Sequence, residues 1–413
     1  MKKHQLVFVE TEGRILDGLR SNLAGARPDW CILLVVDASA ALELVSQRSI
    51  SIVLANFGTD RRGCKEFFRT IRDDAPQVIR MGLLPDQQKE TVSNSLEYAH
   101  ECIANHCAAE QVEAMIARGL VVWERSKENP RLSALMSDLH TLPTPPALYF
   151  DIRDELESPT GSARSVAHII ARDPAITARL LKLANSGFYG TPRTISDLYE
   201  AITLLGLDMV LALVLAAHMF DQLPLPGVNL DVLWVHSFAV ATLAKEIAME
   251  EGCNRSVAST CGIAGLLHDL GELIFLANAS ESYYTMVRRS GGDERVLLQI
   301  EIEQFGVGHP ELGALILSLW GLPEDVVQAV AYHHGGNNQP FEAAPLPSKA
   351  VCIAEWLLQA HNLEDEAEVT GTCLDGRLPI GSDPVAGWRQ ILERLVEQGL
   401  IQQLYTPDEE LFS

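Results

Sequence analysis

Residues 262–275 read GIAGLLHDLGELIF, an apolar helical pattern interrupted by the adjacent polar residues His268 and Asp269. Burying two such groups costs free energy unless hydrogen bonds or an ion satisfy them. Imidazole nitrogen and carboxylate oxygen are both ligands of divalent metals, so a bound cation is one explanation. The other is a pair that hydrogen-bonds locally at a helix end, and this stretch alone does not decide between them.

Composition narrows the classes of protein that fit the chain. Its 413 residues allow two or three domains, and a hydrophobic content of 47% excludes wholesale disorder. A formal net charge of -23 argues against non-specific binding to nucleic acid and against binding to anionic membranes. The eight cysteines include no CxxC pair, which argues against a cysteine-based zinc site. With no visible secretory signal, and an apolar stretch at 210–217 too short for a bilayer, we expect a cytoplasmic protein with reduced thiols.

Short apolar runs alternate with helical patterns over residues 1 to about 122. The runs that suit strands are 6–9, 31–36, 50–55, 78–84 and 102–104. The helical patterns that follow them are 13–23, 40–45, 65–71, 93–98 and 110–122. This alternation predicts a doubly wound α/β domain with a parallel sheet.

The order and size of these elements, with the segment FFRTIRDDAP at 67–76, resemble the receiver domain of two-component response regulators. The resemblance implies an acid pair after the first strand that holds magnesium. It also implies an Asp after the third strand that accepts phosphate, and a Lys after the fifth strand that contacts it. In this chain Glu10 is followed by Thr11, and the third strand ends in Ala55 and Asn56. Either of the last two is the acceptor equivalent, and neither can form an acyl phosphate.

The remaining receiver position has also changed. The Lys position is Asn105, followed by His106, where that family usually has Pro. Asp60 in the loop after the third strand is best explained as a solvated acid. We therefore expect residues 1–125 to form a degenerate, receiver-like domain that serves for docking or dimerisation instead of phosphoryl transfer.

Beyond this domain the pattern becomes helical. Residues 126–146 read as a linker and first helix, broken by LPTPP at 142–146. From 147 to 362 nearly every segment has the helical period and none alternates like a strand. The back half of this part is predicted as helices at 233–250, 261–275, 282–288, 294–305, 310–319, 323–333 and 347–359. Residues 363–413 are predicted as a loop and an added helix at 388–400.

Two sets of motifs in the helical part point to a family. The segment HIIARDPAITARLLKLANSGFYGTPRTISDLYEAITLLG at 168–206 resembles the front half of an HDOD domain, a regulatory relative of the HD phosphohydrolases. LLHDLGELIF, FGVGHPELGALIL and AVAYHHG resemble its back half. The resemblance covers roughly residues 130 to 360. It implies an all-α bundle of HD type and a role in signal transduction.

Five of the twelve histidines recur in the back half of the helical part: His236, His268, His309, His333 and His334. A single histidine on an apolar helix face is usually a packed core residue. Five of them, with Asp269, on different predicted helices or helix ends suit a metal site built from facing helices.

The family resemblance gives these residues roles. In catalytic HD proteins a His, a His–Asp pair and a distal Asp surround one metal. The distal Asp falls here at Glu355, whose carboxylate sits one methylene further from the backbone. In the HD-GYP group further histidines bind a second metal. The implied ligands are His236, His268, Asp269, His309, His333, His334 and Glu355. The implied cofactor is one or two divalent ions of Fe, Mn, Mg, Ni or Zn.

The chain also departs from the HD-GYP pattern. The Lys of the run HDIGK is Glu272 here, and HHGG, with Gly335 and Gly336, replaces the beginning of the GYP loop. An acid in place of a substrate-binding cation disfavours an anionic cyclic dinucleotide. A bound metal could reverse the local sign of the potential.

Three interpretations of function follow. The first is a bacterial-type signalling protein that acts on protein partners, with a homodimer as one option. The second is a metal-dependent phosphohydrolase or phosphodiesterase for a nucleotide or cyclic dinucleotide second messenger. In that enzyme Asp269 would orient or deprotonate the attacking water. The third is a scaffold whose histidines only pack.

Overall fold

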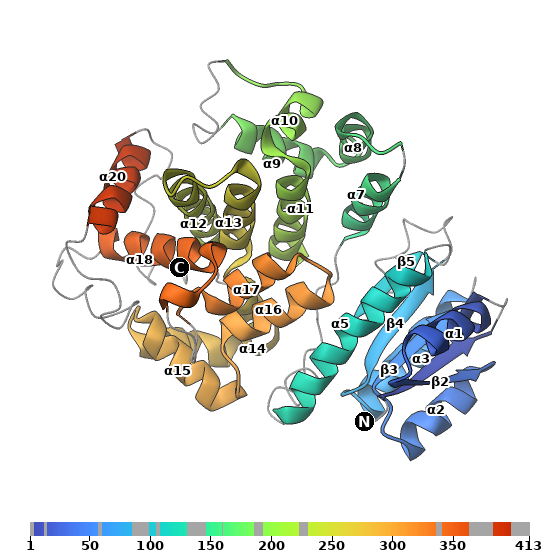
Figure 1. The fold of residues 1–413 in the computed structure, drawn as a ribbon. Coiled ribbons are helices and arrows are strands. Elements are labelled where there is room, and N and C mark those ends of the chain that lie inside the picture. Colours follow the sequence, from blue (N-terminus) through green and yellow to red (C-terminus); the bar gives the residue numbers. More distant parts are fainter. Residues whose placement is uncertain are drawn as a thin grey trace. The chain divides into compact units, whose positions relative to one another are not determined.

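The computed structural model of the chain describes residues 4–11, 15–56, 60–84, 99–104, 108–129, 146–158, 160–185, 193–222, 230–335, 341–362 and 383–397. The chain forms two compact units. The first is Met1–Ala147 with Leu317–Gly321, and the second is Leu148–Ile316 with Leu322–Ser413. Figure 1 shows a sheet flanked by helices in the first unit and helices throughout the described residues of the second.

The first unit is built on a parallel sheet with the strand order β2-β1-β3-β4-β5. The strands are β1 (His4–Glu10), β2 (Trp30–Val35), β3 (Ile52–Asn56), β4 (Ile79–Leu84) and β5 (Glu101–Ala104). In the register of the two central strands, Leu6 lies beside Ile52 and Glu10 lies beside Asn56. The order is the flavodoxin-like one, in which the first strand lies inside the sheet and functional residues follow the carboxyl ends of the strands.

The helices of this unit cover both faces of the sheet. They are α1 (Ile15–Ala26), α2 (Ala38–Gln47), α3 (Arg61–Asp74) and α5 (Ala109–Glu128). Helix α1 contacts α5, and α2 contacts α3, as expected when right-handed crossovers place successive helices on opposite faces. The central strands are buried on both sides, which explains why they read as continuous apolar runs. The prediction of a parallel α/β sheet is therefore confirmed. The predicted helix at 93–98 lies outside the described residues.

The second unit is helical throughout its described residues, apart from the single 3-10 turn η3 (Phe341–Ala343). Its front half contains α7 (Ala147–Glu157), α8 (Ala163–Ile170), α9 (Pro174–Ala184), α10 (Leu198–Leu205) and α11 (Leu207–Gln222). Its back half contains α12 (Leu230–Glu250), α13 (Arg255–Leu267), α14 (Leu270–Ser290), α15 (Glu294–Phe305), α16 (His309–Leu319), α17 (Glu324–Tyr332), α18 (Leu346–Asn362) and α20 (Asp383–Glu397). Helices α12, α13 and α18 contact one another, and α17 joins them against α13 and α18.

The structure corrects two of the predicted helices. The segment predicted as one helix over 261–275 is two helices, because α13 ends at Leu267 and α14 begins at Leu270. The segment predicted separately as 282–288 is part of α14, which is kinked at Ala279. Hydrophobic periodicity continues through the break, so the sequence pattern does not reveal that His268 and Asp269 form a corner between two helices.

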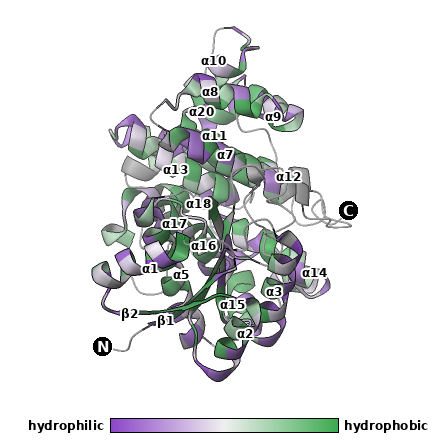
Figure 2. Ribbon diagram, turned by 90° about the vertical axis from the view of Figure 1, so that its right-hand side faces the viewer, coloured by the Kyte–Doolittle hydropathy of each residue, from purple (hydrophilic) through white to green (hydrophobic). Residues whose placement is uncertain are grey.

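Among the described residues, two helical stretches are long and apolar enough to cross a membrane, Val232–Glu250 and Arg255–Ala279, and a bent pair made of α10 and α11 would be a third. Within the tested windows, 50% and 78% of the residues are buried inside the structure. Figure 2 shows hydrophobic residues (green) on the helices of the second unit, where hydrophilic residues (purple) are interspersed among them. Burial in a protein core accounts for the apolar composition of these helices.

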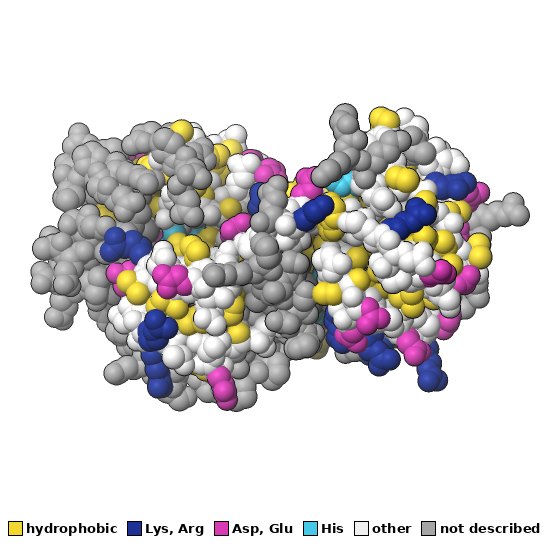
Figure 3. Space-filling view, turned by 90° about the horizontal axis from the view of Figure 1, so that it is seen from below, with side chains coloured by type: hydrophobic (Ala, Val, Ile, Leu, Met, Phe, Trp, Pro, Cys, Tyr) yellow, Lys and Arg dark blue, Asp and Glu magenta, His cyan; other side chains and the backbone are white. Residues whose placement is uncertain are grey.

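Figure 3 shows one face of the molecule, on which basic and acidic side chains are interspersed among hydrophobic and neutral ones. Among the described residues on this face, charges of one sign do not gather into a large patch. This face gives no electrostatic sign of a nucleic-acid surface.

Candidate metal centre

The break between α13 and α14 is shaped by two glycines. A Cβ atom at Gly265 would lie 2.8 Å from the Cα of Ala241 on α12, so only glycine allows α13 to approach α12 this closely. A Cβ atom at Gly271 would overlap the backbone carbonyl of His309 at the start of α16. These two close approaches bring the corner at His268 and Asp269 against both neighbouring helices.

All seven predicted ligands meet around this corner. They are His236 on α12, His268 and Asp269 between α13 and α14, His309 at the start of α16, His333 and His334 after α17, and Glu355 on α18. Four of the five histidines are buried, and the side chains of His334 and Asp269 are 5% and 16% exposed. Facing helices therefore deliver the residues to one buried point, as in metal sites of helical bundles.

Four of these residues form what we call the first cluster: His236, His268, Asp269 and Glu355. The Nε2 atoms of His236 and His268 are 3.2 Å apart. Oδ2 of Asp269 lies 2.8 Å from Nε2 of His268 and 3.3 Å from Nε2 of His236. Oε2 of Glu355 lies 3.2 Å and 3.3 Å from the same two nitrogens. The longer side chain of Glu355 thus reaches the position where the family pattern has Asp.

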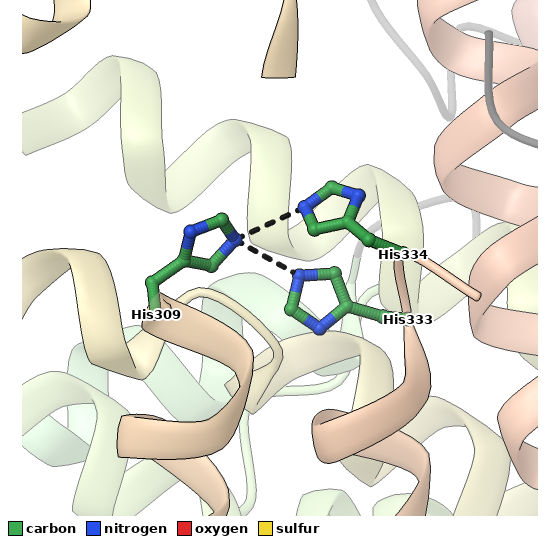
Figure 4. A group of neighbouring side chains, drawn as sticks. All are labelled: His309, His333 and His334. Atoms are coloured by element: carbon green, nitrogen blue, oxygen red, sulfur yellow. Dashed lines mark hydrogen bonds between the residues drawn. The ribbon is translucent and has the colours of Figure 1, made fainter. Parts of the chain in front are cut away.

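The remaining three histidines, His309, His333 and His334, form the second cluster (Figure 4). Nε2 of His309 lies 3.2 Å from Nε2 of His333 and 3.0 Å from Nε2 of His334. Oδ1 of Asp269 is 3.6 Å from Nε2 of His333 and 4.0 Å from Nε2 of His309. Asp269 therefore lies between the clusters, with one carboxylate oxygen toward each.

The hydrogen bonds of the histidines fix where their lone pairs point. Nδ1 of His268 donates to the carbonyl of Gly265 at 2.7 Å, and Nδ1 of His333 donates to the carbonyl of Val330 at 2.6 Å. Because a carbonyl only accepts, each Nδ1 carries a hydrogen and a neutral ring presents a lone pair at Nε2. The Nε2 atoms that converge in each cluster would repel one another unless a proton or a metal lay between them.

His309 is held by a carboxylate instead of a carbonyl. Glu301 on α15, which is fully buried, accepts from Nδ1 of His309 at 2.9 Å and from its backbone N–H at 2.8 Å. The hydroxyl of Tyr283 donates to the other oxygen of Glu301 at 2.6 Å. A carboxylate behind a histidine orients the ring and raises its basicity as a ligand. The sequence analysis missed both residues, although Leu297, Glu301 and Phe305 share one helix face and Glu301 interrupts it.

In the metal-free protein the pKa values of the clustered histidines differ, because each ring has different charged neighbours. Burial opposes charging of His268, but Asp269 and Glu355 outweigh it and raise its pKa to about 9. The pKa of His236 is also raised, against burial, by Glu355 and Asp269. In the second cluster burial lowers the pKa of His309, but Glu301 outweighs burial and raises this pKa to about 9. Burial and the neighbouring His309 lower the pKa of His334 to about 4.

The residues fit a divalent ion in each cluster. Two ligand atoms that are each about 2.1 Å from one ion lie about 3.0 to 3.4 Å apart in octahedral or tetrahedral geometry. The contacts within the first cluster run from 2.8 to 3.3 Å, and those between Nε2 of His309 and the Nε2 atoms of His333 and His334 are 3.2 and 3.0 Å. Oε2 of Glu355 is buried and receives no hydrogen bond from the described residues. A buried carboxylate oxygen of this kind requires a proton or a cation nearby.

A small cavity of about 10 Å³, roughly the space of one water molecule, borders the first cluster. Its polar residues are Asp269, Glu272 and Ser237, and its other walls are leucines and Ala216 of α11. Burial and the charge of Asp269 raise the pKa of Glu272 to about 8. None of the residues that line this cavity is Lys or Arg. The replacement of the family's lysine by Glu272 thus leaves the cavity without a cation from its lining residues.

The receiver-like positions of the first unit present a different arrangement. Glu10 and Asn56 are buried side by side at the ends of β1 and β3, and Nδ2 of Asn56 donates to Oε1 of Glu10 at 3.2 Å. The Glu10 carboxylate also accepts from the backbone N–H groups of Ile15 and Leu16 at the start of α1, at 2.7 and 3.1 Å. Asn105 and His106 lie outside the described residues, as does Gly336 of the second unit.

Comparison with known proteins agrees with the helical motifs. Residues 142–335 match the family model of the HDOD domain. This range contains the histidines of both clusters and Asp269, whereas Glu355 lies beyond it. The chain therefore carries an HDOD domain in its helical part.

Individual relatives are distant. An HDOD domain protein of unknown function from Geobacter sulfurreducens is 25% identical, with a TM-score of 0.50, over 67% of this chain and 98% of that chain. A Shewanella amazonensis protein provisionally named a phosphohydrolase is 24% identical, with a TM-score of 0.48, over 65% of this chain and 96% of that chain. An uncharacterized protein of Treponema pallidum (strain Nichols) is 26% identical over 226 residues, which are 54% of this chain and 44% of that protein. The chain thus matches less than half the length of this curated relative.

Proposed function

We propose that this chain is a signal-transduction protein whose HDOD unit holds one or two divalent metal ions and acts through binding of protein partners. The observation that carries the proposal is the convergence of histidine Nε2 atoms on either side of Asp269, 3.2 Å apart in each cluster. In His268, His309 and His333 the Nδ1 hydrogen is already donated to a backbone carbonyl or to the carboxylate of Glu301. A scaffold of packed histidines would not need so many unshared lone pairs at one buried point.

The first unit supports a regulatory role. In a receiver domain the acid after the first strand serves a magnesium ion, whereas Glu10 here accepts two backbone N–H groups and the amide of Asn56. The position that would accept phosphate is an amide or Ala55, and neither forms an acyl phosphate. We propose that residues 1–125 are a receiver-like unit used for docking or dimerisation, and that the protein is cytoplasmic.

The test of the metal proposal is elemental analysis of the full-length chain. The protein is purified without chelator and dialysed, and its Fe, Mn, Ni, Zn and Mg are counted per chain. We expect one or two ions in the wild type and fewer in the Asp269→Asn variant, because one residue faces both clusters. A wild type that holds no metal after growth with each of these ions would remove the proposal. Sedimentation of the same full-length sample shows whether the chain is a dimer.

A metal-dependent phosphohydrolase is the second candidate, and the shared position of Asp269 beside a cavity favours it. A divalent ion in such a site supplies Lewis-acid polarisation of a phosphoryl oxygen and lowers the pKa of water. The carboxylate of Asp269 is partly exposed, and in such an enzyme it would orient or deprotonate a water at the cavity. Glu272 in the same wall supplies no positive charge that would attract an anionic substrate.

Turnover assays separate the two candidates. The full-length protein, loaded with each metal, is offered cyclic dinucleotides and nucleoside phosphates. An enzyme would release phosphate or linear product, and the Asp269→Asn variant would not. Metal content without turnover of any of these compounds would favour the regulatory function and count against the enzyme.

A further inference from the structure

The second cluster has a further neighbour that the sequence motifs do not contain. Glu294 is the first residue of α15, and its Oε2 lies 3.2 Å from Nε2 of His334. Its side chain is 23% exposed, which is low for an acid in the first turn of a helix. Helix α15 is the element that also supplies Glu301 to His309. Two acids of one helix therefore approach the second cluster from different sides.

The neighbouring residue shows that capping does not explain Glu294. Asp293 is the N-cap of α15, and its carboxylate accepts from the backbone N–H groups of Arg295 and Val296. The free N–H groups of the first turn are thus served by Asp293, as is usual at an N-cap. The carboxylate of Glu294 instead turns toward the imidazole of His334.

Two features of the second cluster suit an added carboxylate. Nε2 of His334 lies within 3.2 Å of both Oε2 of Glu294 and Nε2 of His309, and one ring nitrogen cannot satisfy both with a single hydrogen. Both separations match those of atoms that share an ion, which are about 3.0 to 3.4 Å. The three histidines are also neutral ligands, so without Glu294 the only carboxylate oxygen among the proposed ligands of this cluster would be one of Asp269.

We infer that Glu294 is a ligand of a divalent ion in the second cluster, so that this ion is held by three histidines, Asp269 and a carboxylate from α15. The first cluster contains two carboxylates, Asp269 and Glu355, and with Glu294 the second has the same number. The inference rests on the proposed function, because it assigns a further residue to the metal centre proposed there.

The experiment counts and titrates metal in three full-length proteins: wild type, Glu294→Gln and the control Glu324→Gln. Glu324 is the exposed first residue of α17 and accepts a hydrogen bond from Gln328, so the control removes a charge from an equivalent helix position that is not part of either cluster. Each protein is stripped with chelator and titrated with Mn²⁺ by calorimetry. Electron paramagnetic resonance of the loaded samples reports whether two Mn²⁺ ions are coupled.

We expect the wild type and Glu324→Gln to bind two ions with a coupled spectrum. Glu294→Gln should bind the second ion at least about 10-fold more weakly and give the spectrum of a single ion. Two ions with unchanged affinity and coupling in Glu294→Gln would overturn the inference while leaving the metal proposal intact. A wild type that binds no Mn²⁺ or other divalent ion would instead remove the proposed function itself.

Discussion

The two units each bury polar side chains at the ends of their secondary-structure elements, but they satisfy them in opposite ways. In the first unit the Glu10 carboxylate is met by the backbone donors of α1 and by the amide of Asn56. In the helical unit the acceptors of Asp269, Glu355 and the histidines face one another. A buried acid therefore indicates a cation site only where the chain itself does not supply the donors. Four experiments test this difference.

The largest effect should come from removing metal from the helical unit. An ion that binds only the folded state stabilises it by about 4 kcal/mol when its free concentration is 1,000-fold above the dissociation constant. We expect urea denaturation to show a loss of about this size when Mn²⁺ is replaced by a chelator. The Asp269→Asn variant is the control and should respond much less. An identical midpoint with and without metal in the wild type would contradict the expectation.

The second experiment gives the first unit a pair of neighbouring buried carboxylates without enough donors, as in the helical unit. Asn56→Asp places a second carboxylate 3.2 Å from Glu10 and removes the amide donor. An uncompensated buried charge should lower the free energy of unfolding by roughly 3 kcal/mol, measured by urea denaturation. Mg²⁺ should recover part of this loss. Asn56→Ala removes the donor without adding a charge, and its stability should show no response to Mg²⁺. A response equal to that of Asn56→Asp would contradict the difference between the two units.

The third experiment tests the support behind His309. In wild type, Tyr283 and His309 donate to different oxygens of Glu301. In Glu301→Gln only one of these oxygens remains, and the amide N–H₂ group that replaces the other would point at a donor. We expect a loss of about 2 kcal/mol in the free energy of unfolding of the metal-free protein. Metal affinity, measured by calorimetry, should fall about 10- to 100-fold. Glu303→Gln, at an exposed position of the same helix, is the control. An effect of equal size in both variants would count against a specific role for Glu301.

The fourth experiment measures how stability depends on pH, and its change per proton and per pH unit is the smallest of the four. In the metal-free protein the pKa values of His268 and His309 are raised to about 9 by their carboxylate partners, against burial. A raised pKa stabilises the folded state fully below the ordinary value of 6.5, and this contribution is lost as the pH rises through about 9. Between pH 7 and 9 the free energy of unfolding should fall by about 1.4 kcal/mol per pH unit for each such proton.

Metal should remove this slope, because an ion displaces the same protons and the loaded folded state then binds no more protons at these rings than the unfolded chain does. Urea midpoints measured from pH 7 to 9 should therefore fall in the metal-free protein and change little in the metal-loaded protein. Parallel curves would show that the ion does not compete with protons at these histidines.

The sequence predicted the residues that converge at the candidate metal centre better than it predicted the residues that support them. The spacing of strand and helix patterns gave the parallel sheet and the helical unit, since periodicity reports which face of each element is buried. The motifs around His236, His268, His309 and His333 identified residues that the structure brings together. Their binding of metal remains a prediction.

The supporting residues were missed for physical reasons. Glu294 and Glu301 lie in the segment ERVLLQIEIEQF, where acids at short intervals resemble the solvated face of a helix. Their environment depends on contacts with His334 and His309, which are distant in the chain. The corner between α13 and α14 was missed because its flanking residues are apolar on both sides of His268 and Asp269.

The glycines at the corner have a consequence for how such a protein can change over evolutionary time. At Gly271 even a methyl group would collide with the main chain of His309, and at Gly265 it would crowd the main chain of Ala241. A lineage that gave up its ions could replace imidazoles and carboxylates one by one while its helices stayed together. The same lineage would still have to keep both glycines, so they should outlast the metal chemistry proposed for this site.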